Sequence, residues 1–199
     1  MSTQSKINPI LTLDYIVKAA ENKLFDRKSA KTKASELAPL ISAFANAEGG
    51  TIVIGVSDKS RELEGLNGCD TDKINNFIAA PKEYCKPMPR YEEEFLNFIH
   101  PDGKSDKLLL LHIEASPDQI IRTSNDSTFL RIGDKTKEIK GNDLRNLEYG
   151  KRFCFYTITR VYRNGQKVGH IPNCSRISGI RMAGRYCKCG NASRICNDW

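Results

Sequence analysis

The stretch AFANAEGGTIVIGVSD, residues Ala43–Asp58, decides the fold. Its first part continues a helical pattern of apolar residues, and Gly49-Gly50 ends that pattern, as glycine just past a helix commonly does. Thr51–Val56 follows as an almost unbroken β-branched run. A run that is apolar on both faces is typical of a central strand covered by helices. The stretch therefore predicts a helix, a glycine stop and a buried strand in direct succession.

Upstream of this stretch, apolar residues recur at helical spacing in two places. They predict an amphipathic helix over Leu11–Lys23 and a second helix over about Lys33–Ala47. The residues Leu24–Lys28 between them favour a short extended segment.

Downstream, turn residues and apolar runs alternate. Asp70–Ala80 is predicted as a helix capped by Asp70 or Thr71 and ended by Pro81. The remaining expected elements are a return segment, a hairpin, a further strand and a closing helix: Glu62–Leu66, Glu94–His100 with Lys107–Ala115, Ser127–Ile132, and Gly141–Tyr149. Mixed strands with interspersed helices predict an α/β (α+β) domain with a mixed central sheet flanked by helices.

Charge divides the 199-residue chain into a body and a tail. The net charge is +7, but residues 1–148 hold 21 Lys+Arg against 23 Asp+Glu, whereas residues 149–199 hold 10 against one. Two of the seven cysteines lie in the body and five in the tail, and an odd total argues against a disulfide framework. We therefore expect one domain over residues 1–150 and a basic, Cys-rich tail over 151–199.

The tail allows several interpretations. Phe153–Tyr162 with a turn at Asn164-Gly165 is a hairpin signal. Zinc is weakly supported, because the tail cysteines lack the paired Cys-x2-Cys spacing of structural zinc sites; they include Cys174, Cys187, Cys189 and Cys196. A basic tail could also bind nucleic acid non-specifically. Alternatively, the change in composition indicates a truncated or frameshifted segment without evolved function.

No export or membrane signal is evident. Residues 1–10 contain one lysine and no apolar core, and no apolar run approaches the roughly 20 residues of a spanning helix. The default expectation is a cytoplasmic protein without a membrane partner. Its oligomeric state stays open.

Three segments resemble the Schlafen AlbA domain family. Ala43–Asp58 is similar to its core motif, Phe25–Lys28 to its Glu-Phe-Lys element with Asp in place of Glu, and Phe129–Asp134 to its aromatic-x-Arg-Val-Gly strand. Their order and spacing match over about residues 14–150. The resemblance implies a nucleic-acid-binding domain, because bacterial members are described as DNA-binding or as candidate transcriptional regulators. It also allows an endoribonuclease, because animal Schlafen cores cleave transfer and ribosomal RNA.

Glu21, Asp26 and Asp58 occupy positions that resemble the catalytic triad of the cleaving Schlafens. Asp58 follows the predicted central strand, at the kind of edge where α/β folds gather their sites. Three carboxylates can hold Mg²⁺ or Mn²⁺, which would activate water for phosphodiester cleavage. In an extended segment Asp26 and Lys28 share a face, so Lys28 could neutralise the phosphate. The alternative is that these acids are solvated charges at the ends of elements.

Basic residues in two places are candidates for contact with a phosphate backbone. The first group surrounds the start of the second helix: Arg27, Lys28, Lys31 and Lys33. The second lies on and after the 127–132 strand: Arg131, Lys135 and Lys137. In each case the alternative is an ordinary solvated surface.

Three functions stay open. The leading one is a nucleic-acid-binding module of a regulator that grips the backbone of DNA or RNA. The second is a metal-dependent endoribonuclease acting on structured RNA such as tRNA, and the third is a protein-interaction scaffold. ATP binding is not supported by Gly103-Lys104-Ser105, because Phe98 stands where a phosphate-binding loop needs glycine and a strand follows.

Overall fold

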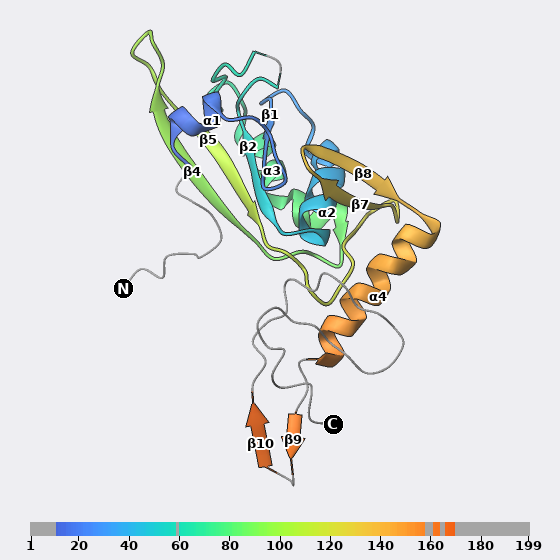
Figure 1. The fold of residues 1–199 in the computed structure, drawn as a ribbon. Helices are drawn as coiled ribbons and strands as arrows, with labels where there is room; N and C mark the ends of the chain where they lie inside the picture. The colour runs from blue at the N-terminus through green and yellow to red at the C-terminus, as the bar shows by residue number, and fades with distance from the viewer. Residues whose placement is uncertain (1–10, 59, 158–160, 164–165, 170–199) are drawn as a thin grey trace.

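Two four-stranded sheets with flanking helices make up the core of the computed structural model, which describes residues 11–58, 60–157, 161–163 and 166–169 (Figure 1). The first sheet has the order β1-β2-β5-β4. Its strands are β1 (Phe25–Lys28), β2 (Gly50–Ile54), β5 (Ser105–Ile113) and β4 (Tyr91–Ile99). β1 is parallel to β2 and the other pairs are antiparallel, so the sheet is mixed. The predicted α/β (α+β) fold class is confirmed.

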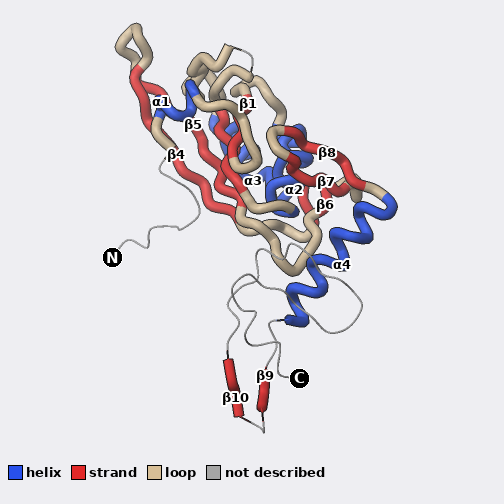
Figure 2. Tube along the Cα trace, viewed as in Figure 1, coloured by secondary structure: helices blue, strands red, loops and turns tan. Residues whose placement is uncertain are grey.

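β2 is the buried strand that the sequence predicts. It lies between β1 and β5, and all five of its residues are buried. Because side chains alternate along a strand, Ile52 and Ile54 pack in one core cluster and Val53 in another. Figure 2 shows that helices cover this sheet on both faces.

The two core clusters identify the helices on each face. The first cluster contains buried residues of α2 (Ala38–Asn46) and α3 (Thr71–Tyr84), and the second contains Ile16 of α1 (Leu13–Lys18). α1 is much shorter than the predicted helix over Leu11–Lys23, because its C-cap, Ala19, is already extended with ψ of 147°.

The second sheet has the order β3-β6-β7-β8, and all its pairs are antiparallel. Its strands are β3 (Cys85–Lys86), β6 (Arg122–Thr123), β7 (Thr128–Ile132) and β8 (Lys135–Ile139). β7 confirms the strand predicted over Ser127–Ile132, while β8 was not predicted, because its sequence KTKEI is too polar for a strand signal. α2 lies between the two sheets, and eight of its nine residues are buried.

Two prolines explain departures from the predicted helices. The predicted helix over Lys33–Ala47 begins with a 3-10 turn, η1 (Ala34–Leu37), and Pro39 then stands in the first turn of α2, where a missing N–H does no harm. The prediction that Pro81 ends α3 is wrong, because the helix continues to Tyr84. Burial of Phe77, Ala80 and Pro81 on the core side of α3 compensates for the one lost helical hydrogen bond.

The β4–β5 hairpin is confirmed, with Gly103-Lys104-Ser105 at its turn and the first residue of β5. The predicted return segment over Glu62–Leu66 makes one bridge, from Leu63 to Val56. The return segment lies beside the end of β2 as predicted, although it is not a full strand, and the hairpin pairs with β2 through β5.

The closing helix α4 runs over Gly141–Thr157 and is longer than predicted. The prediction that a tail strand starts at Phe153 is therefore wrong, because this residue lies in α4. The strands β9 (Val161–Arg163) and β10 (Gln166–Gly169) do pair antiparallel. The turn at Asn164-Gly165 and the four candidate zinc cysteines lie outside the described residues. In the part of the chain that the structure describes, no helix is long and apolar enough to cross a membrane.

Asn46, the last residue of α2, connects this helix to the second sheet. Its Nδ2 donates to the carbonyl oxygens of Ile121 (2.7 Å) and Phe129 (3.0 Å). Its Oδ1 accepts from Ile121 N (2.9 Å) and from Lys151 Nζ of α4 (3.3 Å). One buried amide thereby connects α2 to the β6–β7 region and to α4.

Asn46→Ala should lower the free energy of unfolding by about 3 kcal/mol, because it removes the side-chain hydrogen bonds to the buried backbone groups of Ile121 and Phe129. Lys151 keeps its hydrogen bonds to the carbonyl oxygens of Ser116 and Gln119. Thr128→Val is the matched control, since Thr128 Oγ1 is buried with no hydrogen-bond partner among the described residues. It should change stability by less than about 1 kcal/mol. Urea unfolding followed by circular dichroism measures both, and equal destabilisation by the two variants would contradict the role given to Asn46.

Candidate nucleic-acid interface

The short strand β1 carries charged residues that make mostly inward contacts. Lys28 Nζ lies 2.6 Å from Asp26 Oδ1 and also donates to the Arg27 carbonyl oxygen (2.8 Å). The Lys28 side chain is one quarter exposed, whereas that of Asp26 is only 5% exposed. The expectation that Asp26 and Lys28 share a face is confirmed by this contact.

The second oxygen of Asp26 is bound from the other sheet. Arg131 Nη1 of β7 lies 2.8 Å from Asp26 Oδ2, and both side chains are nearly inaccessible to water. Arg131 also donates to the Asn22 carbonyl oxygen (3.0 Å) and lies over the Phe44 ring, 5.1 Å from its centroid. Asp26 is therefore fully engaged by two cations.

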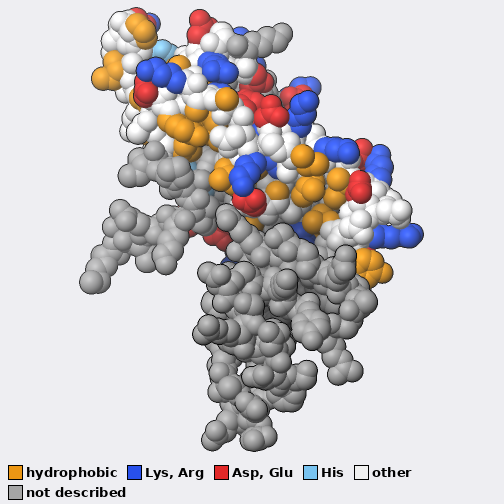
Figure 3. All heavy atoms as spheres, in the orientation of Figure 1, with side chains coloured by type: hydrophobic (Ala, Val, Ile, Leu, Met, Phe, Trp, Pro, Cys, Tyr) orange, Lys and Arg blue, Asp and Glu red, His pale blue; other side chains and the backbone are white. Residues whose placement is uncertain are grey.

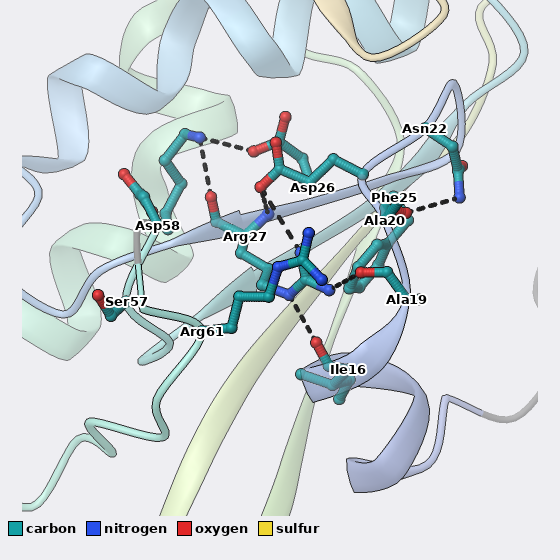
Figure 4. A network of polar contacts seen from close by, with 12 residues as sticks. Ile16, Ala19, Ala20, Asn22, Phe25, Asp26, Arg27, Ser57, Asp58 and Arg61 are labelled. Carbon is teal, nitrogen blue, oxygen red and sulfur yellow. Dashed lines mark hydrogen bonds and ion pairs between the residues drawn. The ribbon is translucent and has the colours of Figure 1, made fainter.

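Arg27 points to the opposite side of β1, toward α1 (Figure 4). Its Nε donates to the Ile16 carbonyl oxygen at 2.5 Å, and Nη2 donates to the Ala19 carbonyl oxygen. Burial lowers the pKa of Arg27, although the guanidinium of arginine stays protonated in proteins. Glu21 lies 3.9 Å from Arg27 Nη1 and partly offsets that effect.

Burial corrects the expectation for two candidate backbone contacts. Arg27 is 2% exposed and Arg131 is 6% exposed, so neither presents its guanidinium to a phosphate backbone. The reason is that the apolar neighbours of each arginine commit its strand to the core, where carbonyl oxygens and Asp26 satisfy the charge. Arg27 ties β1 to α1, and Arg131 ties β1 to β7, so both arginines serve the fold and not an exposed phosphate-binding surface.

The three predicted catalytic carboxylates lie near β1 but make separate contacts. Glu21 Oε1 accepts from Arg27 N (3.3 Å), while the exposed Asp58 accepts from Ser29 N (3.1 Å). Figure 4 shows Asp26 on β1 and Asp58 on the neighbouring segment that follows β2. Among the described residues, no group of three or more His, Cys, Asp or Glu side chains could hold a metal ion. As they are placed, the acids do not fit Mg²⁺ or Mn²⁺.

Apart from Lys28, which is paired with Asp26, the other predicted basic residues are exposed. Lys31, Lys33 and Lys135 have no carboxylate within ion-pair distance in the described part of the chain, and the same holds for Lys137. Figure 3 shows Lys and Arg side chains over β8, the strand that carries Lys135 and Lys137. These lysines are available to an anionic partner.

Lys31 and Lys33 line a hollow of about 330 Å³ against α3. Its walls come from the segment before and within η1 and from α3: Lys31, Thr32, Lys33, Ala34, Ser35, Lys73, Asn76 and Tyr84. None of these residues is acidic. Lys73 was not predicted as a site residue, although it shares one face of α3 with Asn76 and Tyr84. Because the helix was expected to end at Pro81, the sequence did not indicate that Tyr84 lies on the same face.

Comparison with known proteins gives two findings. The family model described as Schlafen, AlbA_2 matches residues 21–140. Among solved structures, the crystal structure of the DIP2311 protein from Corynebacterium diphtheriae is similar at 16% identity and a TM-score of 0.45. That match covers 65% of this chain and 24% of the DIP2311 chain, so this chain matches only a minor part of the other protein's length.

Asp26→Asn should lower the free energy of unfolding by about 3 kcal/mol or more, because it leaves the buried guanidinium of Arg131 without its counter-charge. Asp58→Asn makes the same chemical change at an exposed carboxylate and should cost less than about 1 kcal/mol. Urea denaturation of the two variants tests this difference. Similar midpoints would show that the Asp26–Arg131 pair does not hold the sheets together.

Proposed function

We propose, from the premise that this chain belongs to the Schlafen AlbA_2 family, that residues 21–140 bind nucleic acid by holding its phosphate backbone. Such a module would be the nucleic-acid-binding part of a regulator. The observation that carries the proposal is the hollow lined by Lys31, Lys33 and Lys73 with no acidic residue in its wall. Lysines in this position attract phosphates and release the counterions of the polymer on binding.

The distribution of charge supports binding at a local patch. Residues 1–148 are nearly neutral overall, so a general positive field does not attract an anionic polymer to the body of the chain. Ion pairs neutralise many of the cations, including Lys23 with Glu48 and Lys104 with Asp102. The lysines of the hollow and of β8 are among the cations without an ion pair in the described part of the chain, and they supply a local attraction.

The kind of contact predicts weak sequence preference. Lysine amino groups reach phosphate oxygens, which position a protein on a nucleic acid without reading its bases. Base reading in duplex DNA requires a helix or a strand ribbon that enters a groove. In the proposed mode, the lysines supply affinity, and the sequence of the polymer matters little.

A metal-dependent endoribonuclease is the second candidate, favoured by the contacts of Glu21, Asp26 and Asp58 with the consecutive residues 27–29. The engagement of Asp26 with two cations favours binding over cleavage. The assay is incubation of the protein with tRNA and with duplex DNA, with and without Mg²⁺ or Mn²⁺. Retention without cutting supports the module, whereas chelator-sensitive cutting that is lost in Asp58→Ala supports the nuclease.

Lys33→Gln should weaken binding of a tRNA or of duplex DNA by about fivefold at low salt, the equivalent of roughly one phosphate contact. The slope of log affinity against log salt should fall by about 0.7 to 0.9. Fluorescence anisotropy between about 50 and 200 mM KCl measures both quantities.

The matched control is Lys82→Gln, because Lys82 is an exposed lysine half a helical turn out of phase with Lys73 on α3. It removes the same charge from another face of the helix and should leave affinity within about twofold. If Lys33→Gln and Lys82→Gln weaken binding equally, binding follows net charge alone and the hollow is not the site. If the wild-type chain retains no polynucleotide in dilute buffer, the proposed function fails.

A further inference from the structure

The hollow beside α3 concentrates more positive charge than one backbone phosphate requires. Lys31, Lys33 and Lys73 all line it, and none lies within 4.0 Å of a carboxylate in the described part of the chain. An internal phosphodiester carries a single negative charge. A phosphomonoester carries about 1.5 to 2 negative charges near pH 7, because its second pKa is about 6.

Two acidic side chains close in sequence to the lysines of the hollow accept hydrogen bonds from the backbone. Asp70 caps α3 by accepting from the backbone N–H of Lys73 (2.6 Å). Glu36 accepts from the backbone N–H of Lys33 (3.3 Å). In the described part of the chain, neither carboxylate forms an ion pair with the amino group of Lys33 or Lys73.

The two walls of the hollow run in the same direction. Cys69, just before α3, donates its thiol to the Ala30 carbonyl oxygen, and Cys85, just after α3, donates to that of Ala38, each at 3.8 Å. The segment 30–38 therefore lies along α3 from start to end. Lys31 and Lys33 lie nearest the first turns of the helix.

The hollow consequently has a basic end and an aromatic end. Lys73 and Tyr84 are eleven residues apart on one face of α3, which corresponds to about 16 Å along the helix axis. Thr32, Ser35 and Asn76 supply neutral polar groups between these ends. Tyr84 is half-buried, so its ring is held in place and is partly open to solvent.

We infer that this hollow binds the terminal phosphate of a nucleic-acid strand, with the phosphomonoester at Lys31, Lys33 and Lys73 and the terminal nucleoside directed toward Tyr84. The inference rests on the proposed function and specifies which part of the polymer occupies the site. A doubly charged end group matches three free cations better than an internal linkage does. An unpaired terminal base can stack on an aromatic ring, whereas a base inside a duplex cannot.

The test compares three single-stranded oligonucleotides of identical sequence, carrying a 5′-phosphate, a 3′-phosphate or hydroxyls at both ends. Fluorescence anisotropy on the full chain should show about tenfold tighter binding of one phosphorylated form than of the hydroxyl form, as expected for one additional charge-assisted contact. A nucleoside monophosphate should compete with that form. The preferred end identifies the source of the phosphate.

Lys73→Gln should abolish the preference while leaving weak binding of all three oligonucleotides. Lys82→Gln on the other face of α3 should keep the preference. Lowering the pH from about 7.5 to about 5.5 should reduce the preference in the wild-type chain, because the end phosphate loses its second charge over this range.

The outcomes separate the two proposals. Equal binding of all three oligonucleotides would overturn the end-phosphate inference and leave the proposed function standing. A preference that survives in Lys73→Gln would also overturn it, since the selectivity would then come from elsewhere. Absence of binding to any of the three, and to tRNA and duplex DNA, would overturn both.

Discussion

The buried ion pair between Asp26 and Arg131 is the constraint on which the arrangement of the two sheets depends. It joins β1 of the first sheet to β7 of the second at 2.8 Å, beside the Phe44 ring of α2. Ion pairs of this kind add little net stability when complete, but they are costly to break because one charge stays buried. The pair therefore fixes how the sheets meet, and α2 fills the space between them. Asn46 fixes the position of α2 against the second sheet in a similar way, through hydrogen bonds to the backbone of Ile121.

The same constraint decides which charges reach the surface. The charged side chains of β1, which ends at Lys28, contact other groups of the protein. Glu64 binds the turn that follows β1. Its Oε2 accepts from Ser29 Oγ (2.6 Å) and from Ala30 N (2.9 Å). Immediately after this turn, Lys31 and Lys33 face solvent against α3. One short segment thus changes from interior scaffold to exposed basic surface at a turn that the carboxylates of Glu64 and Asp58 hold together.

The sequence predicted those parts of the fold that have strong local patterns. The α2–Gly49-Gly50–β2 succession and the β4–β5 hairpin follow from periodicity and turn residues. β3, β6 and β8 were missed, because strands of two residues, or of alternating lysines, carry no such signal. The site was predicted in part. Lys31 and Lys33 come from a visible basic run, but Lys73 becomes part of the site only when α3 packs beside them, and no local pattern reveals that Arg27 and Arg131 are buried.

The two oxygens of Asp26 are both committed to cations within this architecture. A divalent cation needs carboxylate oxygens that are free to coordinate it, and here one oxygen is bound to Lys28 and the other to Arg131. Recruiting Asp26 to a metal would displace Arg131 and leave a buried guanidinium uncompensated, at about 3 to 5 kcal/mol. That is a large share of the stability of a typical domain. A carboxylate that joins the two sheets in this way is therefore costly to release to a metal ion.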